Sequence, residues 1–320
     1  MQSFKIDLPH SQFSGRFSVP KNRSSSKFVP LLVCIHGGGY DSEYFDASPE
    51  YSITAVTKAL GIPVVAIDRP GYGDSDPFQP PIPSDGPRKD DTFAHQQGLY
   101  LNSYVLPAVW QEFGEKSGAT AVVLLAHSIG AMMAISAAGQ DSGRYPLAGL
   151  ITSGIGAELN LEISARFLSL LGSTEQTHAK FNTVIRDAAM LQLPAMKVTD
   201  PQVAQFSERL NKPTPIQEMI EINTTWLDSW HRYSHAIKVP VMYGISEFDE
   251  LWLSTQEAVH KYRDAFPASP RVECGIVPMA PHCIELSLQS RGWLARCCGF
   301  AMECAGWDYL NNRGRVPTSE

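Results

Sequence analysis

The sequence has no apolar run long enough to cross a bilayer, and its first twenty residues lack the basic start and apolar core of a secretory signal. These absences predict a cytoplasmic protein. What remains is a chain of 320 residues with 43% hydrophobic and 18% charged content, which is an ordinary globular composition. A chain of this length forms one large core carrying an insertion, or two domains.

Positive charge is also in short supply, since 26 lysines and arginines stand against 33 aspartates and glutamates, for a net charge of −7. Without a basic surface, nucleic-acid backbones and anionic lipids are poor ligands. We therefore expect a small-molecule substrate as the partner, and neither nucleic acid nor a membrane. Composition leaves a homodimer open.

The six cysteines lack the C-x-x-C spacing of metal and redox sites. Two of them, Cys34 and Cys274, fall within apolar strand-like runs. The others fall in a C-terminal segment of helical character: Cys283, Cys297, Cys298 and Cys304. We predict buried free thiols and no disulfides, and we expect neither a metal ion nor a cofactor.

Short β-branched runs alternate with longer helical segments along the chain, without internal repeats. This alternation predicts an α/β fold with a mostly parallel central sheet flanked by helices. Residues 3–7 and 15–19 are expected to form an N-terminal hairpin. Further strands are expected at residues 29–35, 63–68, 121–126, 147–153, 239–244 and 272–277.

One gap between predicted strands is much longer than a crossover connection requires. Between residues 153 and 239, amphipathic segments are separated by breaks at Gly172, Pro194, Pro201 and Pro213. Because the strands on both sides fit one sheet, we interpret residues 157–236 as an inserted helical cap on a core of residues 1–156 and 237–320. A separate helical domain is the alternative. The proline-rich residues 77–89 are expected to form a surface loop.

Ser128 lies where an apolar strand passes directly into a small-residue helix, in TAVVLLAHSIGAMMAISAAG. A nucleophile elbow has this arrangement, because the serine projects from a sharp turn and small residues two before and two after it let strand and helix approach closely. Ala126 and Gly130 meet the requirement, although the common G-x-S-x-G pattern has glycine at the first position. An ordinary serine in a strand-to-helix turn is the alternative.

Consecutive glycines follow the first predicted core strand, in CIHGGGYDSEYF. They allow backbone N–H groups to approach a developing negative charge without obstruction by side chains. We predict an oxyanion hole formed by the N–H groups of Gly38 and Ile129. A phosphate-binding loop is the weaker alternative, because neither G-x-x-x-x-G-K-[ST] nor G-x-G-x-x-G occurs here. For His36 we expect a structural hydrogen bond that holds the loop.

A serine nucleophile needs an imidazole to take its proton and a carboxylate to orient that imidazole. After the predicted strand VPVMYGI, the segment SEFDELW offers Glu247, Asp249 and Glu250. After the predicted strand RVECGIV, PMAPHCIEL offers His282. The resulting order of serine, acid and histidine is that of the α/β-hydrolases among the common triad folds.

With these motifs in order, the sequence resembles the α/β-hydrolase superfamily, in particular its lid-bearing serine hydrolases and esterases. The resemblance covers nearly the whole chain apart from the cap. DRPGYGDSD, from Asp68 to Asp76, is similar to a structural segment of lid-bearing members. SEFDELW resembles the family run that carries the acid, with Ser246 replacing glycine, which favours Asp249 and keeps Glu247 in reserve.

The resemblance implies acyl chemistry under a cap, because epoxide hydrolases and haloalkane dehalogenases have aspartate where this chain has Ser128. We expect a serine hydrolase acting through an acyl-enzyme on a small to medium apolar carboxylic ester or lactone. A carbon–carbon bond hydrolase of diketones and a non-hydrolytic lyase or ligand receptor are the alternatives. Trp226, Trp230 and Trp252 are candidates for the pocket, with a place in the core as the alternative for each.

Overall fold

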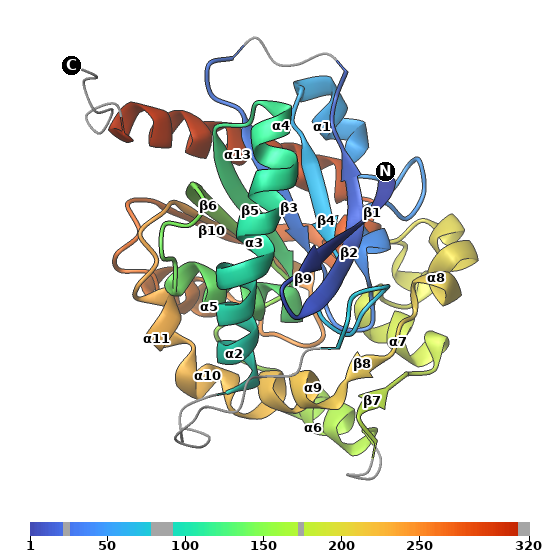
Figure 1. The fold of residues 1–320 in the computed structure, drawn as a ribbon. Coiled ribbons are helices and arrows are strands. Elements are labelled where there is room, and N and C mark those ends of the chain that lie inside the picture. The colour runs from blue at the N-terminus through green and yellow to red at the C-terminus, as the bar shows by residue number, and fades with distance from the viewer. Residues whose placement is uncertain (22–25, 78–91, 172–175, 313–320) are drawn as a thin grey trace, which may run out of the picture.

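The computed structural model describes residues 1–21, 26–77, 92–171 and 176–312 (Figure 1). The predicted break at Gly172 and nearly all of the predicted loop at residues 77–89 lie outside these ranges. The strands of the main sheet are β1 Gln2–Leu8, β2 Ser11–Ser18, β3 Pro30–Ile35, β4 Val64–Ile67, β5 Ala121–His127, β6 Leu147–Ser153, β9 Val241–Phe248 and β10 Val272–Pro281.

These eight strands form one sheet in the order β1-β2-β4-β3-β5-β6-β9-β10. The hairpin β1–β2 is antiparallel and joins β4 antiparallel, and the remaining neighbours are parallel. Ile35 pairs with Ile67 on one side and Ala126 on the other, so β3, β4 and β5 end at one level. This confirms the predicted α/β architecture with its mostly parallel sheet.

Helices cover both faces of the sheet, which is why the central strands have no polar face. In β3, Leu31 and Val33 belong to the apolar core that includes α5, whereas Leu32 and Cys34 belong to the core on the opposite face, beneath α13. The helices that cover the two faces are α1 Thr54–Leu60, α2 Phe93–Tyr100, α3 Leu106–Val109, α4 Glu115–Ser117, α5 Ile129–Gly139, α12 Gln256–Asp264 and α13 Ser290–Asn312. Two π-helical turns link α2, α3 and α4 into one continuous helix.

The long segment between β6 and β9 is largely helical and lies mostly at one end of the sheet (Figure 1). Its elements are α6 Leu161–Ser169, β7 His178–Ala179, α7 Thr183–Met190, α8 Ala204–Leu210, β8 Thr214–Pro215, α9 Ile216–Thr224, α10 Trp226–Ser229 and α11 His231–Ser234, with short 3₁₀ turns beginning at Pro194 and Pro201. The last helix of this segment, α11, packs against α5 of the core. Residues 157 and 236 as boundaries of a cap remain a prediction.

All six cysteines are free, and five of them are buried, with Cys274 partly exposed. Within the described ranges, no helix has the length and apolarity needed to cross a membrane. In the same ranges, no cluster of three or more histidine, cysteine or carboxylate side chains is arranged to hold a metal ion.

Candidate active site

Ser128 occupies a strained turn between β5 and α5, with φ 54° and ψ −126°. Such a backbone conformation costs a non-glycine residue of order 1–3 kcal/mol and persists only where its surroundings enforce it. Here the Ser128 N–H donates to the Ser153 carbonyl at 2.8 Å, and the Ser128 carbonyl accepts from Ala131 N–H at 2.8 Å. A Cβ on Gly130 would lie 2.3 Å from the His36 carbonyl oxygen, so only glycine lets the helix start this close to the sheet.

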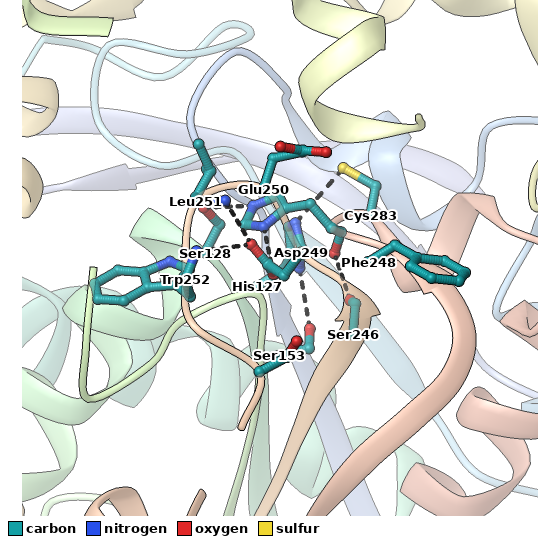
Figure 2. A network of polar contacts seen from close by, with 12 residues as sticks. His127, Ser128, Ser153, Ser246, Phe248, Asp249, Glu250, Leu251, Trp252 and Cys283 are labelled. Carbon is teal, nitrogen blue, oxygen red and sulfur yellow. Dashed lines mark hydrogen bonds and ion pairs between the residues drawn. The ribbon is translucent and has the colours of Figure 1, made fainter. Parts of the chain in front are cut away.

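His282 lies between Ser128 and Asp249 and contacts both. Its Nε2 is 3.2 Å from Ser128 Oγ, and its Nδ1 is 2.8 Å from Asp249 Oδ2. The other carboxylate oxygen of Asp249, Oδ1, accepts the N–H groups of Leu251 at 2.9 Å and Trp252 at 3.1 Å, as Figure 2 shows. Since Oδ1 is held by two backbone donors, Oδ2 is left facing the imidazole. The structure thus brings the three predicted triad residues together.

The reserve acid, Glu247, does not contact His282. Its Oε2 instead accepts the backbone N–H of Met279 at 2.8 Å, at the irregular stretch of β10 where Met279 has φ 53°. The third carboxylate, Glu250, accepts a hydrogen bond from Gln192 Nε2 at 2.9 Å. Asp249 is therefore the carboxylate that geometry assigns to the imidazole.

The two predicted oxyanion donors both border the same cavity as Ser128. Ile129 is the first residue of α5, and the first N–H groups of a helix have no acceptor within it. The glycine loop approaches from the other side: a Cβ on Gly37 would lie 3.0 Å from Ser128 Cβ, and one on Gly38 would lie 2.8 Å from Ile129 Cδ1. A side chain at position 37 would crowd Ser128 itself, and one at position 38 would press on the Ile129 side chain, so glycine gives the loop its closest approach to the turn.

His36 holds the glycine loop, as expected. Its Nδ1 is 2.8 Å from the Gly37 carbonyl oxygen, and its Nε2 accepts the backbone N–H of Arg69 at 3.1 Å. Burial, reinforced by the Arg69 charge, holds the pKa of His36 well below its usual value of 6.5. The imidazole is therefore neutral, with the proton on Nδ1.

A small cavity lies beside Ser128, and its volume is about 40 Å³. Its apolar wall includes Leu159, Phe167, Met190, Met219, Ile222 and Trp252, and Asn223 adds a carboxamide. Of the three tryptophans considered from the sequence, Trp252 lines this cavity. All three are buried in the same apolar core, and Trp226 and Trp230 do not line this cavity.

A second buried network lies behind the imidazole of His282. His127 Nδ1 is 3.0 Å from Ser153 Oγ, which donates to Glu285 Oε1 at 2.8 Å, and Trp293 Nε1 donates to the same oxygen at 2.8 Å. The ring of His127 lies edge-on to that of His282, with centroids 4.9 Å apart. Burial lowers the pKa of His127 well below its usual value, so this ring is neutral too. No local sequence signal distinguishes this histidine.

Arg69 and Glu218 form a fully buried ion pair beside the glycine loop, with Arg69 Nη1 2.6 Å from Glu218 Oε1. Neither was a candidate from the sequence. Arg69 stands in the recognisable DRPGYGDSD segment, but Glu218 lies on α9 and only the fold brings it there.

A family model described as alpha/beta hydrolase family matches residues 32–295 of the chain. Among solved structures, E-2-(acetamidomethylene)succinate hydrolase is similar with a TM-score of 0.62 and 14% identity, over 94% of this chain and 98% of that one. A soluble variant of monoglyceride lipase from Saccharomyces cerevisiae gives a TM-score of 0.66 and 14% identity, over 94% of both chains. An N-acyl homoserine lactonase variant gives a TM-score of 0.59 and 14% sequence identity, over 95% of this chain and 97% of that one. No curated protein sequence matches.

Proposed function

Since the chain belongs to the α/β-hydrolase family, we propose that it is a serine hydrolase that works through an acyl-enzyme. The observation that carries the proposal is the unbroken line of contacts from Ser128 Oγ through His282 to Asp249 Oδ2. It supports Ser128 as the nucleophile, His282 as the general base and Asp249 as the acid that orients the base.

In the acylation step, Ser128 Oγ attacks the substrate carbonyl carbon while His282 Nε2 takes the hydroxyl proton. The carbonyl oxygen becomes an oxyanion, which the N–H groups of Gly38 and Ile129 stabilise. The protonated imidazole then gives its proton to the leaving alkoxide, and the carbon–oxygen bond of the ester breaks. In deacylation, water replaces the alcohol, His282 takes a proton from it, and Ser128 leaves with the proton restored.

For the substrate we propose a small to medium apolar carboxylic ester or lactone. The wall of the cavity beside Ser128 supports this class, because aliphatic, thioether and aromatic groups favour an apolar acyl chain and offer no charge to bind an ionic one. The similar structures include a monoglyceride lipase, an esterase from Thermogutta terrifontis and an N-acyl homoserine lactonase, whose names denote the hydrolysis of esters or lactones.

Labelling with a fluorophosphonate probe tests the nucleophile. We expect the wild-type protein and Ser136→Ala to be labelled, and Ser128→Ala to be unlabelled. Ser136 is a matched control because it lies two turns further along α5, is fully buried and has no hydrogen-bond partner for its hydroxyl. An unlabelled wild-type protein, or labelling that survives Ser128→Ala, would contradict the proposal.

The same preparations, assayed with p-nitrophenyl esters and lactones of increasing acyl length, test the substrate class. We expect kcat/KM to favour short and medium acyl chains, since the cavity beside Ser128 is small. Labelling without turnover of any ester or lactone would leave the reactive serine in place and refute the substrate class.

A further inference from the structure

The peptide unit between Gly37 and Gly38 is held at its carbonyl end by two side chains. His36 Nδ1 lies 2.8 Å from the Gly37 oxygen, and Arg69 Nη2 donates to the same oxygen at 3.3 Å. The amide nitrogen of this same unit belongs to Gly38, the predicted oxyanion donor. Because a trans peptide is planar, its C=O and N–H point in opposite directions, so fixing the Gly37 oxygen also fixes the direction of the Gly38 N–H.

Two adjacent glycines would otherwise leave this peptide free to rotate, because neither carries a Cβ that restricts its dihedral angles. Arg69 also secures the preceding peptide, since its Nε donates to the His36 carbonyl at 2.9 Å. The planar guanidinium therefore spans two consecutive carbonyls of the loop, a geometry that the single ammonium of lysine does not reproduce.

The remaining part of the guanidinium is held by the segment between β6 and β9. Glu218, on α9, accepts from Arg69 Nη1 at 2.6 Å through one oxygen and from the Tyr72 hydroxyl at 2.9 Å through the other. Both side chains of the ion pair are 0% exposed. The next residue along α9, Met219, and then Ile222 line the cavity beside Ser128. One helix thus supplies a wall of the cavity and the anchor of the arginine.

We propose that Arg69 and His36 are positioning residues that orient the Gly38 N–H toward the oxyanion. Glu218 couples this orientation to the position of α9 over the substrate. The inference rests on the proposed serine-hydrolase function. An acyl group that packs against α9 and holds it in place then also favours the productive orientation of the Gly38 N–H. The hydrogen bond from the Gly38 N–H to the substrate carbonyl oxygen strengthens in the transition state, because negative charge develops on that oxygen.

The principal test compares Arg69→Lys with Arg209→Lys. Arg209, on α8, is a matched control because it also joins the inserted segment to the core through a carboxylate, Glu43 at 2.6 Å, and a backbone carbonyl, Ala47 at 2.6 Å. Lysine at position 69 keeps a cation for Glu218 but loses the fork across the two carbonyls. We expect kcat/KM for a p-nitrophenyl ester to fall about 10-fold to 100-fold in Arg69→Lys, against the roughly 10²-fold to 10³-fold loss typical of deleting an oxyanion donor. Arg209→Lys should stay within about twofold.

Two binding measurements separate positioning from general damage. The affinity for a trifluoromethyl ketone, whose adduct with Ser128 carries an oxyanion, should fall in parallel with kcat/KM in Arg69→Lys. Affinity for the intact ester, measured on the Ser128→Ala background, should stay within about twofold. A merely structural role would weaken both ligands alike, and that result would overturn the inference.

Paired substitutions of His36 supply a second route should Arg69→Lys not fold. Asparagine presents an amide donor near the position of Nδ1 and can still reach the Gly37 oxygen, whereas glutamine presents its polar group near Nε2. We expect His36→Asn to retain at least about 10-fold more kcat than His36→Gln. The reverse order, or equal losses, would contradict the role assigned to the Gly37 carbonyl.

The outcomes distinguish this inference from the proposed function. If the wild-type protein labels and turns over esters but Arg69→Lys matches Arg209→Lys in every assay, the inference fails and the proposed function stands. If the wild-type protein neither labels nor hydrolyses esters, both fail.

Discussion

Replacing Asp249 by asparagine is predicted to remove most of the activity while leaving the fold intact. Asparagine has nearly the same shape, and its carboxamide must choose between two orientations. The Leu251 and Trp252 N–H groups, 2.9 and 3.1 Å from Asp249 Oδ1, require an acceptor on that side. With the carboxamide oxygen there, the NH₂ group faces His282 Nδ1, which must then be unprotonated. The proton moves to Nε2, which can no longer take the one from Ser128.

The magnitude follows from these contacts. Turning the carboxamide over restores the productive tautomer but sets its NH₂ against two buried backbone donors, at about 2–3 kcal/mol for the hydrogen bonds lost and the donors left unsatisfied. The productive orientation is therefore populated at roughly 1%. The neutral amide also stabilises the protonated imidazole less than a carboxylate does, by about 1–2 kcal/mol at this fully buried site. The two contributions sum to about 3–5 kcal/mol, so we expect kcat to fall between about 10²-fold and 10⁴-fold, and the corresponding change in a serine protease triad, at about 10⁴-fold, lies at the upper end of this range.

The assay is kcat for a short-chain p-nitrophenyl ester, with urea unfolding as a check on folding. Glu247→Gln is the control, since Glu247 contacts the Met279 N–H and glutamine can still accept that bond. We expect it to stay within about threefold of the wild-type kcat, because it does not touch His282. A loss below about 10-fold in Asp249→Asn, or a larger loss in Glu247→Gln, would refute the assignment of the acid.

Two further predictions concern stability. The pKa of His36 is lowered on folding, so below about pH 6.5 the unfolded chain binds a proton that the folded protein does not, and the free energy of unfolding should fall as pH falls. When urea unfolding is measured between pH 7 and 5, the free energy of unfolding should change with pH less steeply in His36→Gln than in the wild-type protein, by up to about 1.4 kcal/mol per pH unit. Equal slopes in the two proteins would contradict this prediction. Gly130→Ala should lower the free energy of unfolding by about 3 kcal/mol, because its Cβ would meet the carbonyl oxygens of His36 and Ile35 at 2.3 and 2.5 Å. Gly299→Ala, in α13 with open space around its Cβ, should instead be neutral or stabilising by up to about 1 kcal/mol, and similar losses in both variants would refute the steric explanation.

The sheet was predictable because each central strand is covered on both faces and reads as a continuous apolar run. Predicted and observed strands agree closely for β5 and β6. Other strands are longer than predicted: β2 begins at Ser11 and not at residue 15, β10 continues past residue 277 to Pro281, and β9 continues past residue 244 to Phe248. Ser246 still pairs with Val277 of β10 there. Polar residues such as Ser246 and Glu247 resemble a loop in sequence, and only the neighbouring strand shows that their backbone remains in the sheet.

The apolar face of a helix is visible in sequence, but the surface that it packs against is not. Trp226, Trp230 and Trp252 were equivalent candidates on that basis, and the fold buries all three in the core but brings Trp252 alone of them to the wall of the cavity. The pairing of Arg69 with Glu218, 149 residues apart in the chain, likewise had no local signal.

By itself, the sequence determined the α/β architecture and the order of serine, acid and histidine along it, because apolar periodicity, glycine spacing and strand-to-helix junctions are local properties. Tertiary structure decided which carboxylate faces His282. Glu247 and Asp249 are two residues apart, but Glu247 lies in β9 and Asp249 follows the end of that strand. The Leu251 and Trp252 N–H groups hold Asp249 Oδ1 and leave Oδ2 facing the imidazole. Contacts with the imidazole, with the Gly37 carbonyl and across the cavity depend on distances between segments remote in sequence, and these exist only once the sheet has formed.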